Sequence, residues 1–290
     1  MADSRYIFIT GAASGIGRAT AERFAAGGWQ IGAADLNSEG LTNLKTELGG
    51  NQCETFELDV TNFEMFEGAI ADFSDWSGGQ LDLLFNNAGI GILGNVGDVP
   101  LQRQLDTIDV NLVGVLHGIE AALTLLKATP NSLCFSTSSS AAIYGAPGLA
   151  VYAATKFAVK GLTEALSVEL AAHDSRAADV LPGLIDTPIL RAPQYDEKGQ
   201  DVSTGARNVG SEDTGEGPFR LIPPSEIANA VWQAYTSTKI HWYVPAELED
   251  MDKLNIKPSN FTLGILMKMY GRRHQLDKAF RVIEELPRRH

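Results

Sequence analysis

Cysteine is scarce in this sequence: only Cys53 and Cys134 occur among 290 residues. Both stand in apolar, strand-like segments, where a buried free thiol is the usual state. Neither these cysteines nor the five histidines are spaced like metal ligands. We therefore expect no metal site.

Long apolar runs are also missing. No stretch approaches the roughly 18 to 20 apolar residues that a membrane-spanning helix needs, and the apolar run near the N-terminus is too short for a signal peptide. Basic residues are outnumbered, and the formal net charge of −13 argues against nucleic acid as a partner of the whole chain. We expect a cytoplasmic protein with no membrane partner.

The charge is unevenly distributed along a chain that is long enough to bury a large core as one or two domains. Residues 251–290 contain nine basic and four acidic residues, a net charge of +5. Residues 1–250 contain 14 basic and 32 acidic residues, a net charge of −18. Such an asymmetry often marks a segment of different character.

A glycine-rich turn, Gly11 to Gly17, lies between a short β-rich run, Tyr6 to Thr10, and a segment with helical periodicity. Strand, glycine turn and helix in this order are typical of a dinucleotide-binding loop. Glycine lets the backbone approach the pyrophosphate, whose charge then meets the amide groups at the N-terminal end of the helix. We therefore predict nucleotide binding at this turn.

The second predicted strand, residues 29–34, ends at Asp35. A carboxylate at this place accepts hydrogen bonds from the adenosine ribose hydroxyls and repels a 2′-phosphate. No Lys or Arg stands at Asn37 or in the turn at 12–14 to bind that phosphate, although Arg18 is near. We therefore predict NAD rather than NADP. The alternative is that Asp35 caps a helix that begins at Ser38.

Apolar runs and helical patterns then alternate along the chain. Strands are predicted near residues 53–58, 81–85, 132–137, 177–181 and 241–244, and helices near 39–48, 62–76, 101–129, 150–172 and 223–236. This alternation is typical of α/β proteins with a mostly parallel sheet and helices on both faces. We expect a Rossmann-type, doubly wound sheet of seven strands that binds ligands at the carboxyl ends of its strands.

Tyr152 and Lys156 stand four residues apart in a segment expected to be helical, which places both side chains on one face. A nearby positive charge lowers the pKa of a phenol, and a general base works best with a pKa near the working pH. Ser139 follows a predicted strand and could hydrogen-bond a substrate oxygen. Asn111 is unfavourable inside a helix, so it is either exposed or functional. The alternative is that Tyr152 and Lys156 are only a surface pair.

Seven short motifs occur in the order and approximate spacing of one known family. They are TGAASGIG at 10–17, DV at 59–60, NNAG at 86–89, VN at 110–111, Ser139, YAATK at 152–156 and PGLIDT at 182–187. On these motifs the sequence resembles the short-chain dehydrogenases/reductases over about residues 4–250. Each motif alone is weak evidence, whereas together they are specific.

The resemblance implies roles for individual residues. Tyr152 would be the acid/base, and Ser139 would polarise the reacting oxygen, with Ser138 as the alternative serine. Lys156 would hold the nicotinamide ribose and lower the pKa of the phenol, and Asn111 would hold a water in a proton relay. The implied cofactor-binding set, in which Asp59 and Val60 flank the adenine, is Gly11, Ser14, Gly15, Ile16, Gly17, Asp35, Asp59, Val60, Asn86, Ala88, Gly89, Tyr152, Lys156, Pro182, Gly183, Ile185 and Thr187.

The substrate is indicated only by apolar residues that could line a pocket beyond the nicotinamide. They are Ile90, Ile143, Tyr144, Leu149, Leu184 and Leu190. This set suggests a hydrophobic secondary alcohol or ketone. Residues 191–218 have little periodicity, and we expect a mobile loop there, since the corresponding region of the resembled family is a variable substrate lid.

Residues 255–290 depart from that family and resemble a single pentatricopeptide repeat, a helical hairpin of RNA-binding solenoids. We therefore expect an NAD-binding domain at 1–250 and a C-terminal helical hairpin at 251–290. A single repeat cannot span several bases, which favours a hairpin docked on the domain.

Two functions remain. The first is an NAD-dependent oxidoreductase that interconverts a small secondary alcohol and a ketone, with Tyr152 as acid/base. The resemblance implies that such an enzyme is a homodimer or homotetramer, paired through the long helices near 101–129 and 150–172. The alternative is a nucleotide-binding scaffold whose basic C-terminal tail recruits RNA or another protein.

Overall fold

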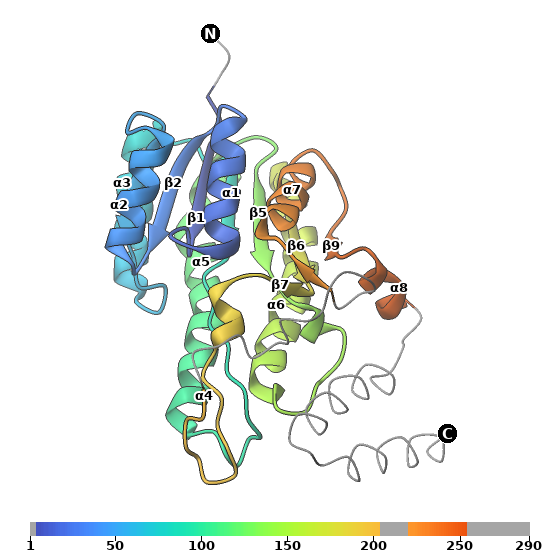
Figure 1. Cartoon of the computed structure of the whole chain (residues 1–290). Coiled ribbons are helices and arrows are strands. Elements are labelled where there is room, and N and C mark those ends of the chain that lie inside the picture. The colour runs from blue at the N-terminus through green and yellow to red at the C-terminus, as the bar shows by residue number, and fades with distance from the viewer. Residues whose placement is uncertain (1–3, 204–219, 254–290) are drawn as a thin grey trace.

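The predicted strands form one sheet in the computed structural model, which describes residues 4–203 and 220–253 (Figure 1). Seven parallel strands lie in the order β3-β2-β1-β4-β5-β6-β9. Their bounds are β1 Tyr6–Thr10, β2 Gln30–Asp35, β3 Cys53–Glu57, β4 Leu83–Asn86, β5 Leu133–Thr137, β6 Arg176–Pro182 and β9 His241–Val244. The predicted Rossmann-type sheet of seven strands is confirmed.

Helices cover both faces of the sheet (Figure 1), and a separate apolar core lies between the helices and the sheet on each face. One core contains Phe24, Leu44 and Val231 from the helices α1 Gly15–Ala26, α2 Ser38–Leu48 and α7 Pro224–Ala234. The other contains Phe73, Ile119 and Val159 from α3 Phe63–Ser77, α5 Gly114–Ala128 and α6 Ala150–Glu169. Because both faces of the sheet are covered, the five central strands are mostly buried and read as nearly continuous apolar runs, whereas the edge strands β3 and β9 are only partly buried.

Shorter elements complete the described chain. They are α4 Leu101–Ile108, a π-helical turn Asp109–Val113, 3-10 turns at Ser140–Ala142, Leu170–His173 and Pro188–Arg191, a two-stranded sheet of β7 Leu184–Ile185 and β8 Leu221–Ile222, and α8 Glu247–Lys253. The helix predicted near 101–129 is therefore one helical stretch with a π-helical turn at Asn111, and π-helical turns often occur at functional sites.

One expectation about apolar runs was wrong. The helical stretch Leu101–Ala128 is long and apolar enough to span a membrane by length and composition alone. In the fold α5 packs against α3 and β4, and the core helix of a globular protein passes the same test. An apolar helix that covers a sheet must be hydrophobic on the face that it buries.

Two other predictions lie partly outside the described residues. In the loop expected at 191–218, the described part lies along the segment after β4: the amide of Leu93 donates to Pro193 O at 3.0 Å, and that of Tyr195 donates to Leu93 O at 2.9 Å. Residues 204–218 lie outside the described residues. So does the predicted hairpin from residue 255 onward.

Candidate active site

The glycine turn at the N-terminal end of α1 leaves little room for a Cβ at its three glycines. Gly11 and Gly15 have positive φ angles of 67° and 52°, which side chains disfavour. A Cβ on Gly17 would lie 2.1 Å from the carbonyl oxygen of Gly11. The N-cap residue Ser14 is exposed, and its side chain makes no capping hydrogen bond. The first amides of α1 therefore remain for an anionic ligand, and the turn fits a dinucleotide pyrophosphate.

Asp35 lies where β2 ends and faces this turn. Its Oδ2 accepts a hydrogen bond from the Ala13 amide at 3.0 Å, and its Oδ1 accepts one from the Asn37 amide at 2.9 Å. The N-cap of α2 is Asn37, whose Oδ1 accepts from the Gly40 amide at 3.0 Å. The alternative role of Asp35 as the helix cap is therefore wrong.

Arg18, on the first turn of α1, already has two carboxylate partners. The Arg18 Nε donates to Glu22 at 3.1 Å, and its Nη2 forms an ion pair with Glu47. These bonds raise the pKa of Arg18, with the hydrogen bond to Glu47 as the largest cause. The guanidinium is thus held toward α2 and is not free for a phosphate.

A shallow hollow lies beside the turn, where strands β1 and β4 end. It is lined by Thr10, Val60, Asn86, Ala88, Val110, Gly114 and Val115. Asp59 does not line it: its Oδ1 accepts from the Thr61 amide at 2.9 Å and from the Thr61 hydroxyl at 2.7 Å. The side chain of Asn86 is buried against α5, because a Cβ on Gly118 would lie 2.2 Å from Asn86 Oδ1. Only the main chain of Asn86 is left to contact a cofactor.

The motif at 182–187 closes over the other side of the turn. Pro182 ends β6, and the Gly183 amide donates to Val244 O at 2.7 Å. Ile185 is buried and pairs with Ile222 in the small sheet. Thr187 lies against the glycine turn, since a Cβ on Gly15 would meet its Cγ2 at 3.0 Å. Ile16, on the first turn of α1, packs partly buried against the core.

Tyr152 and Ser139 lie together at the carboxyl end of β5. The Ser139 Oγ accepts a hydrogen bond from the Ala141 amide at 3.1 Å, and its own proton can be donated to a second oxygen. Burial raises the pKa of Tyr152, and the hydrogen bond from Ser139 acts in the opposite direction. The lowered phenol pKa expected from Lys156 is therefore not found, because burial is the larger effect.

Lys156 is buried one helical turn beyond Tyr152. Its Nζ lies 5.7 Å from the centre of the Tyr152 ring and donates to the carbonyl oxygen of Thr137 at 2.8 Å. Burial lowers the pKa of Lys156 to about 8, so the amine remains largely protonated at neutral pH. Gly89 lies nearby, because a Cβ placed on it would be 3.7 Å from this Nζ.

Asn111 is fully buried in the π-helical turn, so it is not the exposed polar residue that was one alternative. Its Oδ1 accepts from the Ile90 amide at 2.8 Å, and its Nδ2 donates to Ile90 O at 2.9 Å. The same Nδ2 lies 3.4 Å from the hydroxyl of Thr155 on α6. Asn111 thus holds the segment after β4 beside the helix that carries Tyr152.

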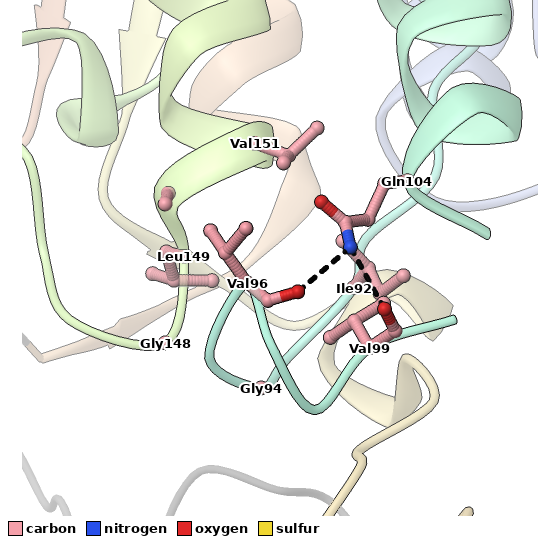
Figure 2. Close-up of a pocket in the computed structure, with 9 residues that line it drawn as sticks. Ile92, Gly94, Val96, Val99, Gln104, Gly148, Leu149 and Val151 are labelled. Carbon is pink, nitrogen blue, oxygen red and sulfur yellow. Dashed lines mark hydrogen bonds between the residues drawn. The ribbon is translucent and has the colours of Figure 1, made fainter. Parts of the chain in front are cut away.

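The predicted substrate residues do not gather around one cavity. Of that set only Leu149 lines the small cavity of about 10 Å³ shown in Figure 2, together with Ile92, Val96, Val99 and Gln104 among others. A cavity of this size holds about one water molecule. Gln104 crosses it, and its Nε2 donates to Val96 O at 2.9 Å and to Val99 O at 2.7 Å (Figure 2).

Tyr144, another predicted substrate residue, does not line this cavity. It is buried against Leu248 of α8 in a small apolar cluster that Ile143 and Tyr243 complete. Burial raises its pKa above the ordinary range. Ile90 is exposed, and Leu184 and Leu190 are half-buried in the segment that follows β6.

A family model described as short chain dehydrogenase matches residues 5–198. The chain belongs to the short chain dehydrogenase family. It is 31% identical to the 3-oxoacyl-acyl-carrier-protein reductase FabG of Thermotoga maritima, over 79% of this chain and 89% of that one. It is 35% identical to the L-2,3-butanediol dehydrogenase of Corynebacterium glutamicum, over 63% of this chain and 73% of that one.

A solved structure agrees with this assignment. The 3-ketoacyl-acyl-carrier-protein reductase from Brucella melitensis, complexed with NADH, matches with a TM-score of 0.71 at 26% sequence identity. The match covers 83% of this chain and 97% of that chain. Our protein is thus an oxidoreductase of the short chain dehydrogenase family.

Sequence analysis of this short chain dehydrogenase gave no role to Asn87. Its Nδ2 donates to Thr10 O at 3.0 Å, and its Oδ1 accepts from the Thr137 hydroxyl at 3.1 Å. The Thr10 hydroxyl in turn accepts from the amides of Asn87 and Ala88, both at 3.0 Å. Asn87 therefore links the glycine turn to the strand end that holds Lys156. The second asparagine of the NNAG motif was the available signal.

Proposed function

We propose that this chain is an NAD-dependent oxidoreductase that interconverts a secondary alcohol and a ketone, with Tyr152 as acid/base. The observation that carries the proposal is the buried Lys156, whose Nζ lies 5.7 Å from the centre of the Tyr152 ring, with the buried Ser139 beside the same phenol. These groups lie at the carboxyl edge of the sheet, on the same edge as the glycine turn. Ligands of open α/β sheets bind at this edge.

The side chains then act on the oxygen of the substrate. A bound nicotinamide cofactor supplies the hydride chemistry. In the reduction direction Tyr152 gives its proton to the carbonyl oxygen, and its raised pKa keeps the phenol protonated at neutral pH. Ser139 donates a hydrogen bond to the same oxygen, where negative charge develops. Lys156 holds the ribose next to the nicotinamide, and Asn111 keeps α6 in register with the segment at Ile90.

The preference for NAD rests on two carboxylate arrangements. Asp35 faces the glycine turn from the end of β2, where it would repel a 2′-phosphate. Arg18, on the first turn of α1, forms ion pairs with Glu22 and Glu47. The structural relative from Brucella melitensis was solved with NADH, which supports the same cofactor here.

The substrate class rests on the relatives and on the apolar residues after β4 and before α6. Two relatives are named for a 3-oxoacyl group and for 2,3-butanediol, a ketone and a secondary alcohol. Exposed apolar side chains on the helices α4 to α6 support a homo-oligomer: Leu105, Leu116 and Phe157. We place this activity in a domain of residues 1–250 in the cytoplasm.

The cofactor is tested by calorimetry with NADH and NADPH. We expect NADH to bind at least tenfold more tightly than NADPH. Asp35→Ser should reduce the ratio of the two affinities by about tenfold, because it removes hydrogen bonds to a charged group, which contribute roughly 1.5–3 kcal/mol. Serine keeps an oxygen that can accept from the Asn37 amide. Tighter binding of NADPH by the unaltered protein would contradict the preference, and binding of neither would contradict the proposed function.

A further inference from the structure

His117, on α5, contacts the turn that follows β3. Its Nδ1 lies 2.9 Å from the carbonyl oxygen of Val60. A carbonyl oxygen only accepts, so the proton is on Nδ1 and histidine is the donor. The imidazole also lies 5.2 Å, centre to centre, from the ring of Phe63 at the start of α3. The side chain is thus fixed from two sides.

The turn it contacts is otherwise closed by Asp59. The Oδ1 of Asp59 accepts from the amide and the hydroxyl of Thr61, and its carbonyl oxygen accepts from the Asn62 amide at 3.0 Å. The carbonyl of Val60 takes no part in these bonds. His117 and Asp59 therefore hold the same peptide unit from its two ends: His117 binds the Val60 carbonyl, and the Asp59 carboxylate binds the Thr61 amide.

The side chain of Val60 lines the hollow beside the glycine turn. It is buried there with Thr10, beside the partly buried Ala88. The helix α5 approaches Val60 closely, because a Cβ on Gly114 would lie 2.7 Å from Val60 Cγ2. One turn further along α5, His117 reaches the carbonyl of the same residue. The helix α5 thus contacts both the side chain and the main-chain carbonyl of Val60.

The order of the strands indicates which half of the dinucleotide lies here. Tyr152 and Lys156 stand beside β5, on one side of the glycine turn that follows β1. Asp35 and Val60 follow β2 and β3, on the other side. If Tyr152 and Lys156 serve the nicotinamide half, the adenosine half lies toward Asp35 and Val60.

We propose that His117 is a positioning residue for the adenine end of the bound cofactor. It does not touch the cofactor; its hydrogen bond orients the peptide unit after Val60 and so keeps that side chain in the wall of the hollow. The inference rests on the proposed binding of NAD. Because the adenine is remote from the reacting carbon, the effect falls on cofactor affinity and leaves turnover at saturating cofactor unchanged.

The test compares His117→Leu with His117→Asn by calorimetry, using NADH and ADP-ribose as probes. Leucine removes the donor, whereas the amide of asparagine replaces Nδ1 at a similar distance from the backbone and has a similar helix propensity. We expect His117→Leu to lower the affinity for both probes roughly three- to tenfold, which is the effect of losing one neutral hydrogen bond. His117→Asn should restore most of the affinity.

Two further measurements separate positioning from a general structural role. The KM for reduced nicotinamide mononucleotide, which lacks the adenosine half, should be the same in His117→Leu and the unaltered protein. The melting temperature without ligand should change little, because His117 is half-exposed. Unaltered affinity of His117→Leu for ADP-ribose, or an equal loss in His117→Asn, would overturn the inference. Failure of the unaltered protein to bind NADH would instead overturn the proposed function on which it rests.

Discussion

The hydroxyl of Ser138 donates a hydrogen bond to the main-chain oxygen of Lys156 at 2.9 Å. Its neighbour Ser139 lies by the phenol of Tyr152 and acts on the pKa of that phenol. The side chains of successive residues in an extended segment point to opposite sides, so Ser138 and Ser139 have different roles. Ser138 holds the helix that carries Lys156, and Ser139 faces the reacting oxygen.

This division predicts opposite results for two alanine variants. Ser139→Ala should lower turnover about 10²-fold, the usual loss of one donor to a developing oxyanion, with little change in stability. Ser138→Ala should keep turnover within a few fold and lower the free energy of unfolding by about 1 kcal/mol, since it removes one buried hydrogen bond. Steady-state rates and urea unfolding of both variants provide the comparison. Equal losses of turnover would show that the two serines are not distinguished in this way.

The glycine turn offers a second prediction. Gly17→Ala places a Cβ where Gly11 O lies 2.1 Å away, so the turn must move. We expect at least a tenfold loss of NADH affinity, because the amides of the first turn of α1 lose their alignment. The matched control is Gly161→Ala in α6, because a Cβ placed on Gly161 would have no neighbouring atom within 4 Å. It should raise stability by about 0.5–1 kcal/mol and leave NADH binding unchanged. Normal NADH binding by Gly17→Ala would refute the role of the turn.

A buried pair at the edge of the sheet predicts a pH dependence of stability. His241 Nδ1 lies 2.7 Å from Oδ1 of the fully buried Asp179, and its Nε2 lies 3.1 Å from Glu164. Burial lowers the pKa of His241, but Asp179 and Glu164 together raise it more, against the opposing charge of Lys160. Burial is also the largest cause that raises the pKa of Asp179, and His241 acts in the opposite direction.

Both groups therefore hold their protons more tightly in the folded protein than in the unfolded chain. For such groups the stabilisation is complete below the unfolded pKa and is lost as pH rises through the folded one. We expect the free energy of unfolding to fall between about pH 6.5 and the raised pKa of His241. Asp179→Asn should flatten this dependence, whereas His173→Gln, at an exposed site, should not. An unchanged slope in Asp179→Asn would contradict the assignment.

The sequence was informative where local patterns decide the structure. The apolar runs predicted the five central strands because these are buried on both faces, and β-rich runs marked the edge strands β3 and β9. The glycines at 11, 15 and 17 indicated a turn in which a Cβ would meet neighbouring atoms. It failed where distant segments meet. Tyr144 is buried by Leu248, about a hundred residues away in the chain, and no local pattern shows that contact. The same holds for the bond between His117 and Val60.

The pKa of Tyr152 shows a further limit. The spacing of Tyr152 and Lys156 predicted that the charge of the lysine lowers the phenol pKa. In the structure the pKa of Tyr152 is raised instead, because burial disfavours the phenolate. Spacing along a helix gives the geometry of a pair but not the desolvation of its members.

The central claim is that Tyr152 transfers the proton in an NAD-dependent reaction. The most direct measurement is the turnover of Tyr152→Phe with NADH and whichever ketone the unaltered protein reduces fastest, together with the affinity of both proteins for NADH. We predict a loss of turnover of at least about 10²-fold, since general acid catalysis contributes 10² to 10⁴, with NADH affinity preserved. Near-normal turnover of Tyr152→Phe would contradict the account.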